Sequence, residues 1–171
     1  MTITVLRIGH RRGRDERTTT HVGLVARAFG ADAVIVPDDN IAKSLASVAR
    51  RFGGKFDVIF EKNWKRTVDA WNGMIVHLTM YGEELDSGIS KIPAGADILI
   101  VVGGGKVPAE IYDIADFNIS VGNQPHSEIA ALAVFLDRYT RGNWLKRKFD
   151  GQLNILPNPR GKTVVQKNDT E

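Results

Sequence analysis

Short apolar runs alternate with segments of helical spacing along most of this chain, and this order constrains the fold more than any other feature. Most of the runs are continuous stretches of β-branched residues, which is typical of strands buried on both faces of a sheet. Strands that alternate with helices form parallel sheets, so the order predicts an α/β fold: a mostly parallel sheet with helices on both faces. The predicted strands are 3–9, 33–36, 57–60, 74–78, 97–102 and 117–121.

Apolar residues at helical spacing lie between these runs. In the first helix we expect Thr18 or Thr19 to cap the start and Gly30 to take a left-handed conformation at the end. The last helix, 126–140, is apolar on two sides. One side can pack on the sheet, and the other needs a second partner. Further helices are predicted at 41–52, 64–70 and 108–113.

The length of 171 residues is typical of one domain. We assign residues 1–142 to it and expect 143–171 to form an extension that packs on or trails the same domain, with short strands at "LNIL" and "TVVQ". No stretch approaches the roughly 18 consecutive apolar residues of a membrane span. The start "MTITVLRIGH" does not have the pattern of a signal peptide, so we expect a cytoplasmic protein without a membrane partner.

The absence of cysteine excludes several kinds of chemistry. A chain without cysteine forms no disulfide, no thiolate nucleophile and no zinc–sulfur site. Neither clustered carboxylates nor suitably spaced histidines occur, so no metal site is predicted.

Five arginines lie within the eleven residues "RIGHRRGRDER", and this cluster is the strongest charge feature of the chain. We call residues 10–17 the arginine loop. Guanidinium groups bind phosphates with two parallel hydrogen bonds, so the loop indicates a polyanionic partner, although a solvated loop without function remains an alternative. A second basic stretch, "NWLKRKF" at 143–149, is also a candidate for RNA binding. The alternative is that its aromatic side chains only pack against the rest of the protein.

Three predicted strands end in polar loops: "HLTMYG" (77–82), "VGGGKVP" (102–108) and "VGNQP" (121–125). Each loop alone is explained by a tight turn, but three together favour a ligand held by backbone groups, such as an adenosine compound. The "GGGK" stretch lacks the following hydroxyl residue of a phosphate-binding P-loop. No G-x-G-x-x-G opens a helix, so a dinucleotide fold is not supported.

The segments "LRIGHRRGRDERTTTHVGLVARAFGA", "VHLTMYG", "VVGGGKVP" and "VGNQPHSEIAALAVFLDR" resemble the archaeal tRNA cytidine-56 2′-O-methyltransferases, which belong to the SPOUT class. The resemblance covers roughly residues 4–140. It implies a homodimer with a C-terminal trefoil knot whose loops bind S-adenosylmethionine. The implied reaction transfers a methyl group to the ribose 2′-OH of a T-loop cytidine in tRNA.

The resemblance also implies site residues. Other ribose methyltransferases of this class use an asparagine and an arginine in their first motif. Thr18 and Leu24 occupy these positions here, so the motif is not matched, and we assign the catalytic role instead to Arg14 and Arg17 in the arginine loop. Arg12 is a weaker candidate, and His21 is the rival base. The RNA-binding candidates are Arg11, Arg12, Lys146 and Arg147. The implied cofactor-binding residues are Leu78, Gly103, Gly104, Gly105, Lys106, Val107, Val121, Gly122, Asn123, Gln124, Pro125, His126, Ser127 and Glu128.

Two alternatives remain open on the sequence. One is a SPOUT methyltransferase that acts on another RNA position or on a base. The other is a noncatalytic RNA-binding α/β module.

Overall fold

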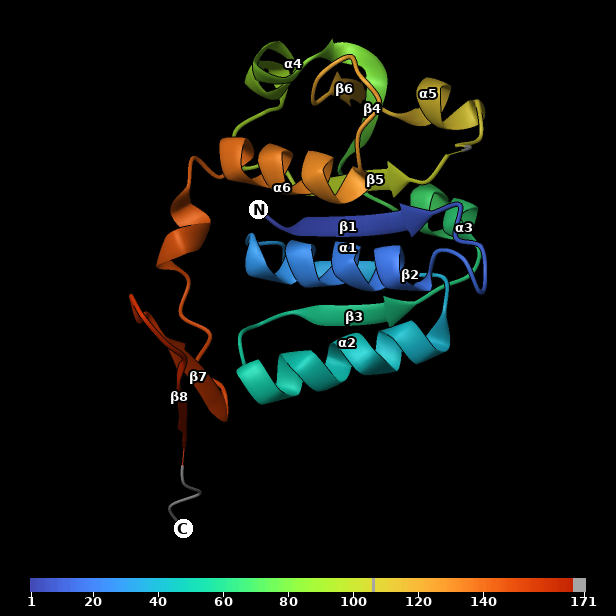
Figure 1. Ribbon diagram of the computed structural model, residues 1–171. Coiled ribbons are helices and arrows are strands. Elements are labelled where there is room, and N and C mark those ends of the chain that lie inside the picture. Colours follow the sequence, from blue (N-terminus) through green and yellow to red (C-terminus); the bar gives the residue numbers. More distant parts are fainter. Residues whose placement is uncertain (106, 168–171) are drawn as a thin grey trace.

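A parallel sheet forms the centre of the molecule. The computed structural model describes residues 1–105 and 107–167, and its six-stranded sheet has the order β3-β2-β1-β5-β4-β6 (Figure 1). Every pairing in this sheet is parallel, which confirms the predicted fold class. The strands are β1 (Ile3–Ile8), β2 (Ala33–Val36), β3 (Asp57–Phe60), β4 (Met74–Glu84), β5 (Ile98–Gly103) and β6 (Phe117–Ser120).

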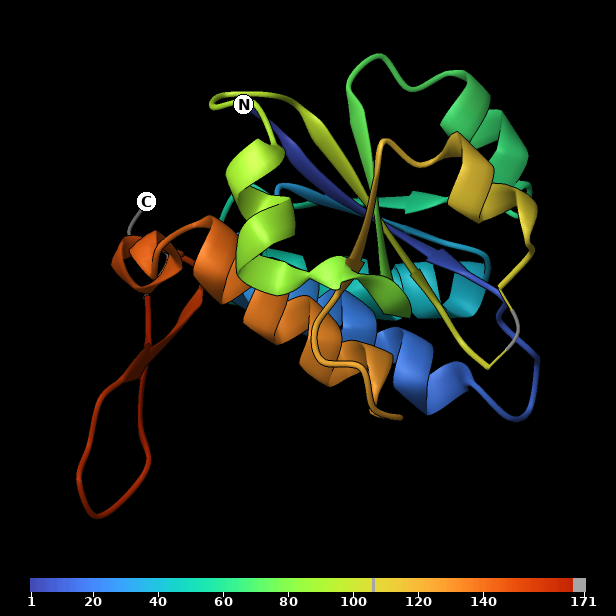
Figure 2. The same ribbon diagram turned by 90° about the horizontal axis from the view of Figure 1, so that it is seen from above.

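Helices cover both faces of the sheet. Side chains of α1, α2, α4 and α6 pack on one face, and those of α3 and α5 pack on the other (Figures 1 and 2). Only α4 was not predicted, because it is short and has Gly88 in its middle. The helices are α1 (Glu16–Ala28), α2 (Asp39–Phe52), α3 (Trp64–Asp69), α4 (Leu85–Lys91), α5 (Glu110–Ile114) and α6 (Glu128–Tyr139).

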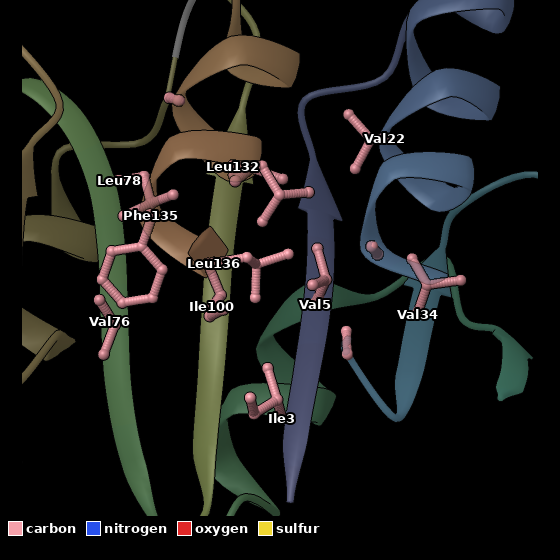
Figure 3. Close-up of a cluster of buried hydrophobic side chains, with 14 of the residues drawn as sticks. Ile3, Val5, Val22, Val34, Val76, Leu78, Ile100, Leu132, Phe135 and Leu136 are labelled. Atoms are coloured by element: carbon pink, nitrogen blue, oxygen red, sulfur yellow. The ribbon is translucent and has the colours of Figure 1, made fainter. Parts of the chain in front are cut away.

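The core follows from the alternation of side chains along the central strands. In β1, Val5 points to the face that α1 and α6 cover, and Leu6 packs on the opposite face. Figure 3 shows Leu132 and Leu136 of α6 beside Ile100 of β5. Because β1 and β5 are buried on both faces, they read as continuous apolar runs in the sequence.

The start of α1 differs from the prediction that Thr18 or Thr19 caps it. The helix begins at Glu16, after Asp15. The backbone N–H of Asp15 donates to the carbonyl of Arg11, and the Asp15 carboxylate accepts from the N–H of Arg11, so the turn closes earlier. At the other end Gly30 has a φ of 94°, which confirms the predicted left-handed residue.

The β6–α6 connection brings distant parts of the chain together. Strand β6 lies at the edge of the sheet beyond β4, and α6 returns to pack beside α1 (Figure 1). Within the connection, the side-chain amide of Asn123 donates to the carbonyl of Met80, at 2.9 Å. The trefoil knot that the resemblance implies remains a prediction.

The C-terminal extension joins the domain through a short 3₁₀ helix (Asn143–Lys146) and ends in an antiparallel hairpin. Arg147 anchors it, since its guanidinium binds the carbonyl of Ala31 at 2.9 Å and the carboxylate of Asp32 at 2.5 Å. The hairpin projects from the body of the molecule (Figures 1 and 2). Its strands, β7 (Leu153–Leu156) and β8 (Thr163–Gln166), are the two short strands predicted for this region.

Candidate active site

A cavity of about 450 Å³ lies at the carboxyl ends of β4 and β5, where ligands bind in parallel α/β sheets. Two of the three polar strand-end loops, 77–82 and 102–108, contribute to its lining, and the third connection adds only His126 and, at the start of α6, Glu128. Residues that the sequence assigned to cofactor binding and that line the cavity are Leu78, Gly103, Gly104, Gly105, Val107, His126 and Glu128. The structure therefore brings together loops that are up to 50 residues apart, from Leu78 to Glu128.

Glycines let the chain pass close to its neighbours around this cavity. A Cβ atom on Gly82 would overlap the carbonyl of Asn118, and one on Gly103 would overlap the side chain of Val107. Around Gly105, by contrast, there is open space. Two of these three glycines are therefore required by packing, and the third leaves the cavity wall without a side chain.

Part of the connection 121–127 does not line the cavity. Residues 122–127 are exposed, and Val121 is partly buried. The predicted cofactor-binding residues in this group are Val121, Gly122, Asn123, Gln124, Pro125 and Ser127. Lys106, also predicted, lies outside the described residues.

Seven residues of the lining were not assigned to cofactor binding from the sequence: His77, Thr79, Met80, Tyr81, Val102, Tyr112 and Ala131. The side-chain amide of Asn118 donates to the carbonyl of Tyr112, so its oxygen faces His77 Nδ1, at 2.9 Å, and accepts a hydrogen bond from it. Burial lowers the pKa of His77, which favours the neutral ring. Its Nε2 is then a buried acceptor without a partner among the described residues. The only sequence signal for His77 was its position near the end of a predicted buried strand.

An ion pair lies behind the cavity wall. Arg7 Nη2 of β1 lies 3.0 Å from Glu128 Oε1, at the start of α6. The arginine side chain is 1% exposed, whereas that of Glu128 is 22% exposed. Ser127 caps the same helix by accepting from the N–H of Ile129. The first turn of α6 is thus fixed both by its cap and by β1.

The arginine loop is held by an internal ion pair. Arg11 binds the carboxylate of Asp15 through Nε, at 2.9 Å, and through Nη2, at 3.2 Å. These hydrogen bonds lower the pKa of Asp15 to about 2. Nε of Arg12 is 3.7 Å from the carboxylate of Asp38. Within residues 1–105 and 107–167, the exposed side chains of Arg14 and Arg17 form no ion pair.

The positions of the predicted catalytic and RNA-binding residues form two groups. The arginine loop and the cavity lie at the same edge of the sheet, because β1 and β5 are neighbours with parallel direction (Figure 2). His21 is exposed on α1. Arg147 binds residues just before β2, so the basic stretch 146–148 lies at the opposite, amino edge (Figure 1). A single chain does not bring the two basic groups together.

The described residues contain neither a membrane-spanning helix nor a cluster of metal-binding side chains. No helix among residues 1–105 and 107–167 is long and apolar enough to cross a membrane. In the same part of the chain, no group of three or more histidine, aspartate and glutamate side chains is arranged to hold a metal ion.

Comparison with known proteins gave consistent matches. Residues 52–165 match the family described as "tRNA ribose 2′-O-methyltransferase, aTrm56". The chain is 51% identical to the tRNA (cytidine(56)-2′-O)-methyltransferase of Thermococcus kodakarensis, with 96% of this chain and 97% of the relative covered. Identity to the protein of the same name from Methanothrix thermoacetophila is also 51%, with 98% and 99% covered.

A solved structure has the same fold. The SpoU methyltransferase AviRb from Streptomyces viridochromogenes, crystallised in complex with the cofactor AdoMet, superposes with a TM-score of 0.57 at 12% sequence identity. The match covers 82% of this chain and 57% of AviRb. At this identity the likeness concerns the fold alone, and it agrees with the SPOUT fold predicted from the sequence.

Proposed function

Because this chain belongs to the aTrm56 family of tRNA ribose 2′-O-methyltransferases, we propose that it methylates the ribose 2′-OH of cytidine 56 in tRNA, with S-adenosylmethionine as the methyl donor. The observation that carries the proposal is the 51% identity over 96% of the chain to a protein named for this reaction. The cavity lined by the loops after β4 and β5 and by the start of α6 supports it, since a cavity at the carboxyl edge of a parallel sheet can hold the methyl donor.

The cavity fits the donor in size and in chemistry. Its volume of about 450 Å³ lies within the range of small-molecule sites. Glycine-lined walls expose backbone groups to an adenosine moiety, and the buried Nε2 of His77 offers an unused acceptor. The carboxylate of Glu128 complements a cationic ligand. We propose that the residues assigned from the sequence hold the donor, together with His77 and Tyr112.

The bound donor supplies a sulfonium methyl group, whose carbon–sulfur bond breaks as a carbon–oxygen bond to the ribose forms. The chain must hold the 2′-OH in line with this bond and help it to lose its proton. We propose that Arg14 and Arg17, whose side chains are exposed in the arginine loop, bind the RNA phosphate and orient the 2′-OH. Arginine is a poor base, so the proton passes to solvent or to His21.

We further propose that two copies of the chain pair through α6 and the connection 121–127. Val134 of α6 is 42% exposed and Tyr81 beside the cavity is 74% exposed, so apolar surface remains on this side. An isologous contact would bury it twice. Light scattering after gel filtration should give the mass of a dimer, and Val134→Glu should give a monomer. A monomeric wild-type protein would contradict the proposal.

The reaction is tested by incubating the purified protein with labelled S-adenosylmethionine and unmodified tRNA, followed by nuclease digestion and mass spectrometry. We expect one 2′-O-methylcytidine at position 56 and no product from a transcript with uridine there. A methylated base, or methylation elsewhere, would favour a SPOUT enzyme of different specificity. Because the proposed substrate is tRNA, we propose that the protein acts in the cytoplasm.

Ligand binding separates an enzyme from a noncatalytic RNA-binding module. A ligand that binds only the folded protein raises the melting temperature. We therefore expect S-adenosylhomocysteine to stabilise the protein, whereas a module without a cofactor site would show no shift.

A further inference from the structure

Arg7 is a buried cation in the middle of the fold. It lies near the end of β1, where its neighbours in the strand are apolar, and its side chain is 1% exposed. Burial lowers the pKa of its guanidinium, and the charge of Glu128 opposes this effect. A buried charge is costly unless it is paired and hydrogen-bonded, so its position calls for an explanation.

The partners of Arg7 come from separate elements. Nη2 pairs with Glu128 Oε1 of α6 at 3.0 Å, and Nε donates to Thr19 Oγ1 of α1 at 3.4 Å. Nη1 donates to the carbonyl of Ile8 at 3.1 Å. A Cβ atom on Gly104 would lie 3.3 Å from Nη2, so the guanidinium also packs behind the glycine loop. Arg7 thus contacts the cavity wall from the interior of the protein.

The same guanidinium is connected to the arginine loop. Thr19 is fully buried and its Oγ1 lies 2.9 Å from His10 Nδ1. Because Thr19 Oγ1 accepts from Arg7, its own hydroxyl proton can be donated to His10 Nδ1. The remaining ring nitrogen of His10 is Nε2. This nitrogen is buried and has no partner among the described residues.

We propose that Arg7 is a positioning residue for both halves of the active site: it holds the Glu128 carboxylate at the donor cavity and, through Thr19, holds the His10 ring at the start of the arginine loop. The proposal rests on the proposed function. It assumes that the cavity beside Glu128 binds the methyl donor and that the arginine loop, which contains His10, binds the RNA. A purely structural ion pair would instead matter for folding alone.

The first test separates the two roles at the cavity. Arg7→Met leaves the Glu128 carboxylate unpaired, so we expect the melting temperature to fall by about 10 °C. The Kd for S-adenosylhomocysteine, measured by calorimetry, should rise about tenfold or more. The double variant Arg7→Met/Glu128→Gln removes both charges and should recover most of the melting temperature while its Kd stays high.

Two results would overturn the cavity half of the proposal. One is a wild-type Kd in Arg7→Met, and the other is recovery of the Kd along with the melting temperature in the double variant. If Arg7→Met does not fold, the folded double variant decides: a raised Kd supports the proposal and a wild-type Kd contradicts it. Neither measurement uses tRNA, so this half stands or falls independently of the proposed reaction.

The second test addresses His10 with matched pairs. Thr19→Ser keeps the hydroxyl and Thr19→Val removes it, so kcat should fall about tenfold in the valine variant alone, with the Kd for S-adenosylhomocysteine unchanged. His10→Asn can place its amide oxygen near the position of Nδ1 and keep the contact with Thr19, whereas His10→Gln cannot. We expect the asparagine variant to retain more activity. Equal kcat values within either pair would contradict the proposed route through Thr19 and His10.

Discussion

The cavity beyond β4 and β5 is lined by glycine backbone and by buried or half-buried side chains such as His77 and Tyr112, whereas the arginine loop beyond β1 presents long charged side chains to solvent. Both lie at the same edge of one sheet, because β1 and β5 are parallel neighbours. In the cavity, we propose that a ligand is selected by shape and by fixed hydrogen-bond groups. In the arginine loop, we propose that the RNA is attracted by charge. The two regions should therefore respond to different substitutions, the cavity to an added methyl group and the loop to a lost charge.

Gly82→Ala should have the largest effect. The new Cβ overlaps a backbone carbonyl of the neighbouring strand, that of Asn118, which cannot move without breaking the pairing of β4 and β6. We expect the free energy of unfolding to fall by about 3 kcal/mol, as in overpacked cores, and the binding of S-adenosylhomocysteine to be lost. Urea unfolding and calorimetry measure both.

The matched control is Gly105→Ala, since nothing lies within 4 Å of a Cβ at that position. Its stability should stay within about 0.5 kcal/mol of wild type. If Gly82→Ala and Gly105→Ala have the same stability, the close packing around Gly82 does not exclude a methyl group, and the argument from packing is wrong.

Arg14→Ala and Arg17→Ala should act on turnover. Each removes a charged group that we assign to orienting the 2′-OH, and the loss of one such group lowers kcat by roughly 100-fold. The Kd for S-adenosylhomocysteine should not change, because neither side chain lines the cavity. Arg50→Ala, an exposed arginine of α2, is the control. Wild-type turnover in both variants would show that the catalytic assignment is wrong.

The Arg11–Asp15 pair predicts a pH dependence of stability. The hydrogen bonds from Arg11 lower the pKa of Asp15 to about 2 in the folded protein, below its ordinary value of 3.8. A lowered carboxylate pKa stabilises the fold above the unfolded value and this contribution is lost as the pH falls toward 2. The free energy of unfolding should therefore fall more between pH 5 and pH 2 in the wild-type protein than in Asp15→Asn. Parallel curves would contradict the pair's role.

Lys146→Ala should have the smallest effect. This residue lies at the amino edge of the sheet, away from the arginine loop, and its ammonium contacts only the side chain of Asn143 among the described residues. If it touches RNA, tRNA affinity falls by about threefold and the slope of log K against log salt decreases by about one. An unchanged slope would restrict RNA binding to the carboxyl edge.

The fold and the cavity loops were predictable because their signals are local. Continuous apolar runs identify buried strands, and the three polar loops end strands that lie side by side. The residues that sequence reasoning missed depend on neighbours. Arg7 reads as one more arginine of a basic stretch, yet it is buried because α1 packs over β1 and α6 packs beside α1. Arg147 was predicted to bind RNA, which stays a prediction; the structure adds that its guanidinium anchors the extension to Asp32.

The sequence by itself determined the parallel α/β sheet, its helices apart from α4, and the loops after β4 and β5 that line the cavity, because period and glycine placement act over a few residues. The tertiary structure decided which charges are buried, which tautomer His77 carries, and which edge of the sheet each basic group occupies. These properties depend on strand order. The sheet places β1 beside β5, and only this neighbour relation brings Arg7 behind Gly104 and next to Glu128.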